Sequence, residues 1–271
     1  MMNLKKLVSV FALMALCASS ALAAKPLEGK KLVMATSPTF PPFEFADLDP
    51  NTGNEKIMGF DIDMVDAIAE KLGFTYTIVH TNFQGLLGEL SSGRVDFVIS
   101  GMSPTEERKK TVDFSIPYYY CQTAVLQTKN AGVYDVATMK GKPIAAAFGT
   151  EYHKFAAAAG ADIHALDTDA ICLQELLAGR VVGLMLDAAS ASARQKKYPD
   201  AQLVFHVIPQ KDLDAMRSAA VSDCFACVFP KGSELEALFS GALKELMAEG
   251  FMRKNYEKWI GPMPESSKNP Y

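Results

Sequence analysis

The hydrophobic pattern of the first third alternates between short apolar runs and stretches with a helical period. An apolar strand is predicted at 32–36, and a helix follows that Asp61 or Asp63 is expected to cap. The apolar residues on one face of this helix are Met64, Val65, Ile68, Ala69 and Leu72. Gly73 ends the helix before a strand at 75–79, so these residues predict a βαβ unit.

The same alternation continues along the rest of the chain. A short helix is predicted at 84–90 and a buried strand at 95–99. The later elements are predicted as strands at 123–127, 143–148, 181–186 and 225–229 and helices at 151–159, 170–177 and 234–247. This order is typical of an α/β protein with a parallel sheet, in which ligands bind at the carboxyl ends of the strands.

The residues that follow the strand 95–99 concentrate groups that bind anions. Gly101 permits a sharp turn, and residues 103–106, Ser-Pro-Thr-Glu, have the order of a helix start with a capping box. The free amides of such a start favour an anion, and Arg108 in the next turn can bind a carboxylate with two hydrogen bonds. The alternative for the same residues is an ordinary capped helix with an exposed arginine.

A second helix start of this kind follows the strand 143–148. Gly149 and Thr150 form the turn and the cap, and Glu151 is the first helical residue. Two such N-termini that face each other across a cleft would enclose an anion from both sides. Asp187, at the end of a later strand, is predicted either to cap the next helix or to balance a cationic group.

The first residues predict export from the cytoplasm. Lys5 and Lys6 precede the apolar stretch 7–18, and small residues follow it, which is the pattern of a secretory signal peptide over 1–23. Cys17 raises the alternative of a lipid-anchored protein. We therefore expect a soluble protein outside the cytoplasm, in the periplasm.

Length and charge narrow the class of protein. The 271 residues are 49% hydrophobic and include 27 basic and 31 acidic side chains. Without the two lysines of the signal, 25 basic and 31 acidic residues remain, a net charge of about −6. No basic stripe interleaved with aromatic residues is present, so nucleic acid is not an expected partner, and the length predicts two domains.

Four cysteines remain after the signal, and an exported protein can pair them. They are Cys121, Cys172, Cys224 and Cys227, which allow three connectivities of two disulfides. The Cys-x-x-Cys spacing of the last two also occurs in redox and metal sites, so one interpretation of this pair is redox or metal chemistry. The alternative is structural, because residues three apart in the predicted strand 225–229 face opposite sides.

Several motifs occur in an order that resembles one known family. They are Ala35 to Glu44, Gly59 to Asp63, Phe83 to Leu86, Gly101 to Arg108, Asp113 to Ser115, Gly149-Thr150, Phe229 to Gly232 and Trp259. From about Lys31 to Gly261, the chain resembles the extracytoplasmic solute-binding proteins of polar amino acid ABC transporters, the family 3 solute-binding proteins. No cofactor or metal is expected.

The resemblance implies the two-lobed α/β fold of type II periplasmic binding proteins, with two hinge strands and a ligand site in the cleft. The implied boundaries are lobe 1 at 28–117 and 225–262, lobe 2 at 123–219, hinge strands at 118–122 and 220–224, and a tail at 263–271. With these hinges, Cys121 and Cys224 lie on adjacent strands, and a disulfide between them is one expectation; pairs of Cys172 with a C-terminal thiol are the competing ones.

The resemblance also implies roles for nine residues of the cleft. Arg108, Ser103 and Thr150 would bind the ligand α-carboxylate, and Asp187 with the Gly101 carbonyl would bind the α-ammonium. The side-chain pocket would be formed by Phe40, Phe83, Ser37 and Glu151. Such a site recognises a zwitterion through fixed charges of both signs.

Two positions bear on the identity of the ligand. Ser37 stands where relatives often have an acid, whereas Glu151 supplies one; the alternative for Glu151 is a first-turn acid that complements the helix dipole. We expect a monomeric, non-enzymatic protein that captures a polar or basic amino acid, arginine or lysine ahead of glutamine, and delivers it to an ABC permease. The competing hypothesis is a dehydratase-like enzyme of the same fold that uses Glu151 and His153 on a small carboxylate.

Overall fold

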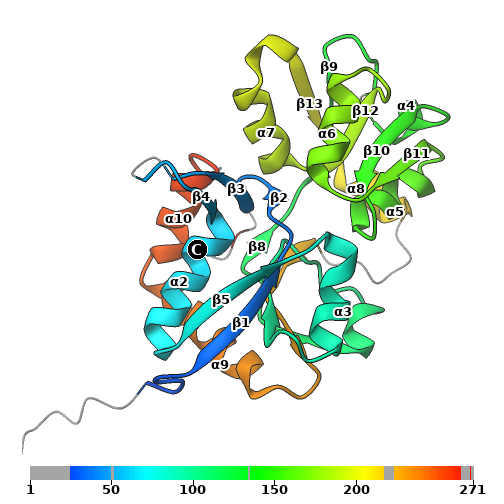
Figure 1. The fold of residues 1–271 in the computed structure, drawn as a ribbon. Coiled ribbons are helices and arrows are strands. Elements are labelled where there is room, and N and C mark those ends of the chain that lie inside the picture. The colour runs from blue at the N-terminus through cyan, green and yellow to red at the C-terminus, as the bar shows by residue number, and fades with distance from the viewer. Residues whose placement is uncertain (1–24, 50–51, 134, 217–222, 264–268, 270–271) are drawn as a thin grey trace, which may run out of the picture.

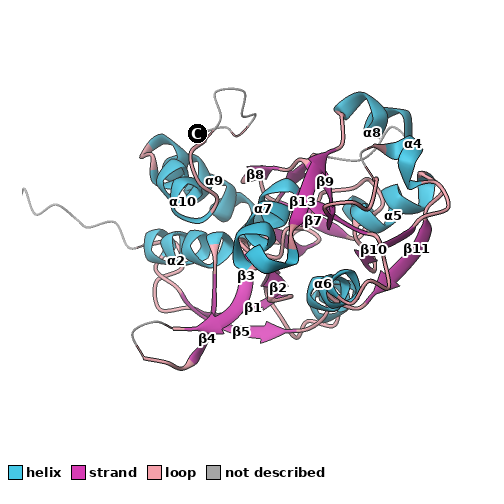
Figure 2. Cartoon of the chain, turned by 90° about the horizontal axis from the view of Figure 1, so that it is seen from above, coloured by secondary structure: helices cyan, strands magenta, loops and turns pink. Residues whose placement is uncertain are grey.

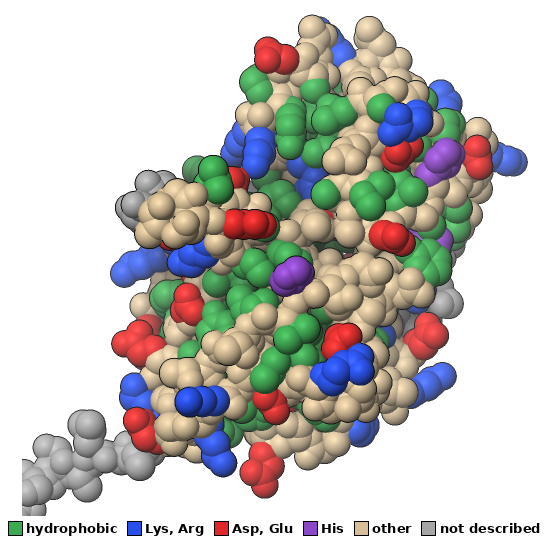
Figure 3. Space-filling model, in the orientation of Figure 1, with side chains coloured by type: hydrophobic (Ala, Val, Ile, Leu, Met, Phe, Trp, Pro, Cys, Tyr) green, Lys and Arg blue, Asp and Glu red, His purple; other side chains and the backbone are tan. Residues whose placement is uncertain are grey.

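The computed structural model describes residues 25–49, 52–133, 135–216, 223–263 and 269, which form two lobes (Figure 1). The predicted signal peptide and most of the predicted tail lie outside these residues. Within the described part, no helix is both long and apolar enough to span a membrane. On the face drawn in Figure 3, basic and acidic side chains are interspersed, so this face carries no extended patch of one sign.

The first lobe contains a five-stranded sheet in the order β5-β1-β6-β15-β7. Its strands are β1 (Lys31–Thr36), β5 (Thr75–His80), β6 (Phe97–Val98), β7 (Val112–Phe114) and β15 (Val228–Pro230). β1 pairs in parallel with β5 and β6, whereas β15 is antiparallel to β6 and β7. A small antiparallel sheet, β2 (Thr39–Phe40), β3 (Glu44–Leu48) and β4 (Glu55–Met58), lies beside it.

Helices cover the sheet of the first lobe. α2 (Phe60–Leu72), α9 (Glu234–Ala248) and α10 (Phe251–Trp259) pack together on one side, as Figure 2 shows. The short helices η1 (Phe83–Gly85) and α3 (Leu86–Ser91) pack against β1, β6 and β15 around a separate apolar cluster. Burial of both sheet faces explains why the central strand β6 and the second half of β1 are fully buried, whereas the edge strand β5 contains no fully buried residue.

The second lobe contains another five-stranded sheet, in the order β11-β10-β12-β9-β13. The strands are β9 (Thr123–Thr128), β10 (Pro143–Ala147), β11 (Asp162–Leu166), β12 (Gly183–Asp187) and β13 (Leu203–Val207). The helices are α4 (Val136–Met139), α5 (Glu151–Ala158), α6 (Asp169–Leu177), α7 (Ala188–Lys197), η3 (Pro199–Ala201) and α8 (Gln210–Met216). Together the two sheets confirm the predicted two-lobed α/β fold.

A short ribbon joins the two sheets. β8 (Tyr119–Tyr120) leads from the first sheet into β9 of the second, and β14 (Cys224–Phe225) leads back into β15. These two strands pair antiparallel, with Cys224 opposite Tyr120. The lobe boundaries themselves remain a prediction, because the return crossing includes residues 217–222, which lie outside the described part.

The four cysteines are present as thiols, so the expected disulfide between Cys121 and Cys224 is not formed. The register explains why. Tyr120 is opposite Cys224, and the amide of Cys121 donates to the carbonyl of Asp223. Cys121 and Cys224 therefore point to opposite faces of the ribbon. No group of three or more His, Cys, Asp or Glu side chains suited to a metal ion occurs among the described residues.

The start of α2 differs from the prediction, because neither Asp61 nor Asp63 caps it. Gly59 is the N-cap residue, and no side chain bonds to the free amides. Instead, the amides of Phe60 and Asp61 donate to the carbonyls of Pro42 and Phe43, both at 2.9 Å. With the first amides satisfied by this loop, the Asp61 side chain turns inward and Asp63 bonds to the indole of Trp259.

Gly59 is the residue that permits this close approach. Its φ of 133° lies in the region that favours glycine, and an added Cβ would lie 2.2 Å from the carbonyl oxygen of Phe43. We expect Gly59→Ala to lower the free energy of unfolding by about 3 kcal/mol or more, measured by urea denaturation. Gly88→Ala in α3, where an added Cβ meets no atom within 4 Å, is the control and should be neutral or stabilising. Equal effects of the two substitutions would contradict this prediction.

Candidate functional site

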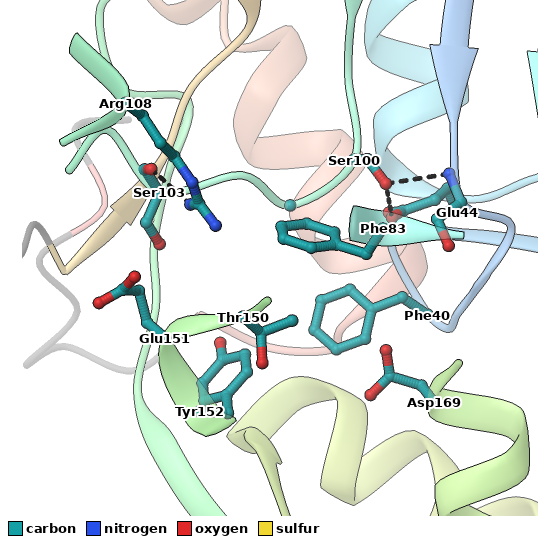
Figure 4. Close-up of a pocket in the computed structure, with 12 residues that line it drawn as sticks. Phe40, Glu44, Phe83, Ser100, Ser103, Arg108, Thr150, Glu151, Tyr152 and Asp169 are labelled. Carbon is teal, nitrogen blue, oxygen red and sulfur yellow. Dashed lines mark hydrogen bonds between the residues drawn. The ribbon is translucent and has the colours of Figure 1, made fainter. Parts of the chain in front are cut away.

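A cavity lies between the two lobes, where residues from both of them meet (Figure 4). The first lobe contributes Ser37, Phe40, Glu44, Phe83, Ser100, Gly101, Ser103 and Arg108, and the second contributes Thr150, Glu151, Tyr152 and Asp169. Eight of the nine residues predicted from the sequence are in this set, and Asp187 is not. The cavity measures about 20 Å³, which is room for about one water molecule. An amino acid can therefore enter only if the lobes or their side chains move apart.

The cavity lies where the topology predicts a ligand site. Ser37 directly follows β1, Ser100 and Gly101 lie just after β6, and Thr150 follows β10. These are the carboxyl ends of parallel strands in both sheets. The site is therefore assembled from two strand edges that face each other, one from each lobe.

Arg108 connects the two lobes. Its Nη1 donates to the carbonyl of Ser103 at 2.8 Å, and its Nη2 donates to the carbonyl of Gly149 in the second lobe at 2.9 Å. The guanidinium carbon lies 5.3 Å from the centre of the Phe83 ring, a cation–π distance. Burial lowers the pKa of Arg108 from its ordinary value, although the nearby Glu151 opposes this shift. The group stays charged, so the cleft contains a cation whose present hydrogen-bond acceptors are two backbone carbonyls.

The prediction that a helix starts at residues 103–106 is wrong. These residues form no regular helix, and only a single 3-10 turn, η2 (Arg108–Lys110), follows. In an α-helix the carbonyl of Ser103 would accept from the amide of residue 107; here it accepts from the amide of Thr105 and from the Arg108 guanidinium. Arg108 itself, and not a helix N-terminus, is therefore the candidate anion-binding group on this side.

The second predicted helix start is confirmed. α5 begins after Thr150, whose Oγ1 accepts from the amide of His153 at 3.2 Å and donates to the carbonyl of Ala147 at 2.7 Å. Of the two helix N-termini that were expected at the cleft, only that of α5 is present. A further hydroxyl, that of Tyr152, is buried beside it and has no hydrogen-bond partner among the described residues.

Asp187 does not reach the cavity, which corrects the role expected from the resemblance. It is fully buried and is the N-cap of α7. One oxygen accepts from the amide of Ala189 at 2.7 Å and from the hydroxyl of Tyr119 at 3.2 Å, and the other accepts from the amide of Gln122 at 2.9 Å. Of the two possibilities left open by the sequence, the structure selects the cap.

Asp169 is the acid of the second lobe that lines the cavity. It is the first residue of α6, after the N-cap Thr168. Burial raises the pKa of Asp169, and the positive charge of Arg194 opposes this shift. The sequence held a signal for it, because an acid follows a capping threonine at a strand-to-helix turn. The sequence prediction, however, began this helix at Ala170 and gave Asp169 no role.

Glu44 is a second acid that the sequence prediction missed. It is 1% exposed, and its Oε1 accepts from Ser100 Oγ at 2.8 Å. Ser100 Oγ in turn accepts from the amide of Ser37 at 3.1 Å. Burial, and next the charge of Asp61, raise the pKa of Glu44 well above its ordinary value. Glu44 belongs to one of the motifs that carry the resemblance, but nothing in a five-residue strand reveals that an acid at its start faces a cavity.

The charges of the site are separated along the cavity. Figure 4 shows Glu151 beside Arg108 at one end, and Glu44 and Asp169 at the other end, beyond the ring of Phe40. Glu151 also pairs with Lys154 at 3.1 Å, so its charge faces two cations. The end opposite Arg108 is therefore the acidic end of the cavity.

A contact outside the cavity also links the lobes. Arg194 of α7 is 2% exposed, and its guanidinium donates to the carbonyls of Thr39 at 3.2 Å and Pro41 at 3.4 Å in the first lobe. Ser190 Oγ donates to the same Pro41 carbonyl at 2.5 Å. A more exposed link is the pair of Lys197 with Asp47 at 3.1 Å. Arg194 thus holds the second lobe against the loop that carries Phe40.

We expect Arg194→Met to lower the free energy of unfolding by about 1 to 3 kcal/mol and to weaken amino acid binding about tenfold. The substitution removes buried hydrogen bonds across the lobes and the cation that faces Asp169, so the closed arrangement is disfavoured. Urea denaturation and calorimetric titration measure the two effects. Lys197→Met, which breaks an exposed pair, is the control and should cost less than about 1 kcal/mol. An Arg194 variant that matches this control would contradict the prediction.

The two-lobed fold and the cleft between the lobes define a class of binding protein. Residues 32–262 match the model of the bacterial extracellular solute-binding proteins, family 3. The chain belongs to this family. Its family and its structural neighbours are binding proteins rather than enzymes.

Particular relatives make the similarity more specific. The chain is 33% identical over 235 residues to the arginine-binding extracellular protein ArtP of Bacillus subtilis (strain 168), covering 85% of this chain and 86% of that protein. It is also similar to the structure of an ancestral arginine-binding protein bound to arginine, at 35% identity and a TM-score of 0.74. The structure of an ancestral arginine-binding protein bound to glutamine has 34% identity and the same TM-score. Both structures cover 85% of this chain, which covers 98% of each.

Proposed function

We propose that this protein captures a basic amino acid, arginine first, between its lobes and delivers it to the membrane permease of an ABC transporter. One observation carries the proposal: the cavity between the lobes has the Arg108 guanidinium at one end and the carboxyls of Glu44 and Asp169 at the other. Such a site matches a zwitterion that carries an additional positive charge. The protein would act as a monomer in the periplasm.

The two ends would divide the ligand between them. The α-carboxylate would bind Arg108, with Ser103 and Thr150, and would take over the hydrogen bonds that Arg108 now donates to backbone carbonyls. The α-ammonium would bind Asp169 together with the carbonyl of Gly101. Asp169 takes this role in place of Asp187, whose oxygens already accept three hydrogen bonds.

The remaining groups would select the side chain. Phe40 and Phe83 line the cavity, and a flat guanidinium stacks well on aromatic rings. Ser37 and Ser100 offer hydroxyls, and Glu44 supplies an acid where Ser37 lacks one. A cationic side chain is therefore favoured over the amide of glutamine. Glu151 lies beside Arg108 and Lys154, so it would belong to the end of the cavity that binds the ligand α-carboxylate and not to the side-chain pocket.

The printed names of the relatives support this choice of ligand. ArtP is described as arginine-binding, and ancestral arginine-binding proteins were solved bound to arginine in one structure and to glutamine in another. The dehydratase-like alternative has no specific support, because Glu151 pairs with Lys154, and His153 is outside the cavity lining and lies against the Phe148 ring. Membership of this family, whose relatives include binding proteins of ABC transporters, supports delivery to a permease.

The test is a thermal-shift screen of the refolded chain without residues 1–23 against the common amino acids. Refolding removes a ligand carried through purification, and a ligand that binds only the native state raises the Tm by mass action. We expect the largest shifts with arginine and lysine and a smaller one with glutamine. No shift with any amino acid would contradict the proposed function, and recovery of a chemically altered ligand would favour the enzyme.

A further inference from the structure

Two carboxyl groups meet at the acidic end of the cavity. Glu44, at the start of β3, is 1% exposed, and Asp61, in the first turn of α2, is 0% exposed. The two acids bond to neighbouring residues of one turn, because Glu44 accepts from the hydroxyl of Ser100 and Asp61 accepts from the amide of Gly101. Each acid also affects the pKa of the other. Two ionised carboxylates have only acceptor oxygens, so a hydrogen bond between them requires a proton on one of them. Glu44 lines the cavity, and Asp61 is not part of its lining.

The remaining hydrogen bonds of the pair lead to the same conclusion. Glu44 Oε1 accepts from Ser100, whereas Oε2 is buried and has no hydrogen-bond partner among the described residues. Asp61 Oδ2 accepts from the amide of Gly101 at 3.2 Å and from the hydroxyl of Tyr118 at 2.8 Å, whereas Oδ1 is also buried and has no hydrogen-bond partner among the described residues. One shared proton would satisfy both orphan oxygens at once.

The charged groups around the pair do not replace that proton. Asp169 of α6 faces Glu44 and adds negative charge, and Arg194 of α7 interacts more strongly with Asp169 than with Glu44. Tyr118 and Cys227 also face the pair, and burial raises the pKa of both, so they stay neutral. Burial raises the pKa of both carboxyls, that of Asp61 to about 6. Geometry and burial thus agree that the pair holds a proton near neutral pH.

We propose that Glu44 and Asp61 share one proton in the ligand-free protein, and that a cationic ligand side chain displaces this proton to solvent. The pair would then set the charge preference of the side-chain pocket. The ligand cation takes over the donor role of the proton, and the full negative charge of the pair balances it. This inference rests on the proposed function, because it requires an amino acid in this cavity.

The displaced proton gives the two ligand types opposite pH behaviour. A cation beside the pair lowers the pKa of the shared proton, so arginine binding strengthens as the pH rises. The limit is tenfold in Kd per pH unit between the pKa of the bound pair and that of the free pair. A neutral ligand such as glutamine leaves the proton in place, so its Kd changes little. Preference for arginine over glutamine therefore increases with pH.

The experiment is calorimetric titration of the refolded protein with L-arginine and with L-glutamine, from about pH 5.5 to about pH 8. Each titration is repeated in two buffers of different ionisation enthalpy, because the difference in observed heat counts the protons released. The α-groups of the two ligands are the same, so subtraction of the glutamine result isolates the side-chain pocket. Glu44→Gln removes the titrating pair, and Asp61→Asn keeps its hydrogen-bond acceptor. Asp63→Asn on the same helix is the control.

We expect arginine, and not glutamine, to release a proton from the protein and from the Asp63 variant. This release should disappear in the Glu44 variant and also in the Asp61 variant, so either one suffices if the other fails to fold. Arginine binding without proton release would overturn the proposal of a shared proton and leave the proposed function intact. Proton release that persists in Glu44→Gln would also overturn it. Absence of binding by either amino acid would contradict the proposed function as well.

Discussion

Arg108→Ala is expected to weaken the binding of every amino acid at least a hundredfold. Arg108 is the cation of the cavity that faces the expected carboxylate, and its loss would leave that carboxylate in a site from which water is excluded. Truncation of one partner of a buried charge pair costs about 3 to 5 kcal/mol, which corresponds to a factor of roughly a hundred or more in Kd. Calorimetric titration with arginine and glutamine measures the effect.

Two further variants sharpen this prediction. Arg108→Lys keeps the charge but loses the planar pair of donors, so we expect an intermediate Kd. Arg94→Ala removes an arginine of the same lobe that pairs with Glu89 at the surface, and it should leave the Kd unchanged. If Arg108→Ala binds arginine as tightly as Arg94→Ala does, the carboxylate lies elsewhere.

Asp169→Asn is expected to weaken the binding of all amino acids by a factor of roughly 30 to 100, whatever their side chain. The substitution leaves the shape of the site unchanged but removes the negative charge that would face the α-ammonium. A ratio of arginine to glutamine affinity that stays near its wild-type value would place Asp169 at the α-ammonium. A change confined to arginine would place it at the side chain.

Asp187→Asn is the matched comparison, because the resemblance implied for Asp187 the α-ammonium role that we propose for Asp169. Its oxygens accept hydrogen bonds from two amides and a hydroxyl, and an amide group cannot accept with both of its ends. We expect a loss of about 1 to 3 kcal/mol in the free energy of unfolding and little change in the Kd of the folded protein. Urea denaturation and calorimetry separate the two effects.

Local patterns predicted most of the secondary structure. The apolar face of α2, the left-handed turn at Gly73 and the cap of α5 at Thr150 all follow from short-range rules, and the structure confirms them. The two-lobed fold and the nine residues of the site were implied by the family resemblance. Eight of these nine residues line the cavity.

The errors fall where distant residues decide the local structure. Residues 103–106 have the composition of a helix start, but the Arg108 guanidinium takes the carbonyl that the helix would need. α2 needs no capping acid, because the loop at Pro42 and Phe43 accepts its first amides. The role of Asp61 follows from its contact with Glu44 in another element, and no spacing along the chain reveals that contact.

Two acids of the second lobe show the same limit of sequence-based prediction. Asp169 and Asp187 both stand at the junction of a turn and a helix, and both have a plausible explanation as helix-terminal acids. Only the packing of α6 against β2 of the other lobe turns Asp169 toward the cavity. The cap of α7, in contrast, keeps Asp187 inside its own network.

The central claim is that the cavity recognises the whole zwitterion of a basic amino acid. Calorimetric titration of the refolded protein with L-arginine and with agmatine, which is arginine without its α-carboxylate, tests this most directly. We expect arginine to bind with a Kd of about 1 μM or lower and agmatine to bind at least a hundredfold more weakly, because only arginine engages Arg108. Equal affinity for the two compounds, or no binding of arginine, would contradict the account.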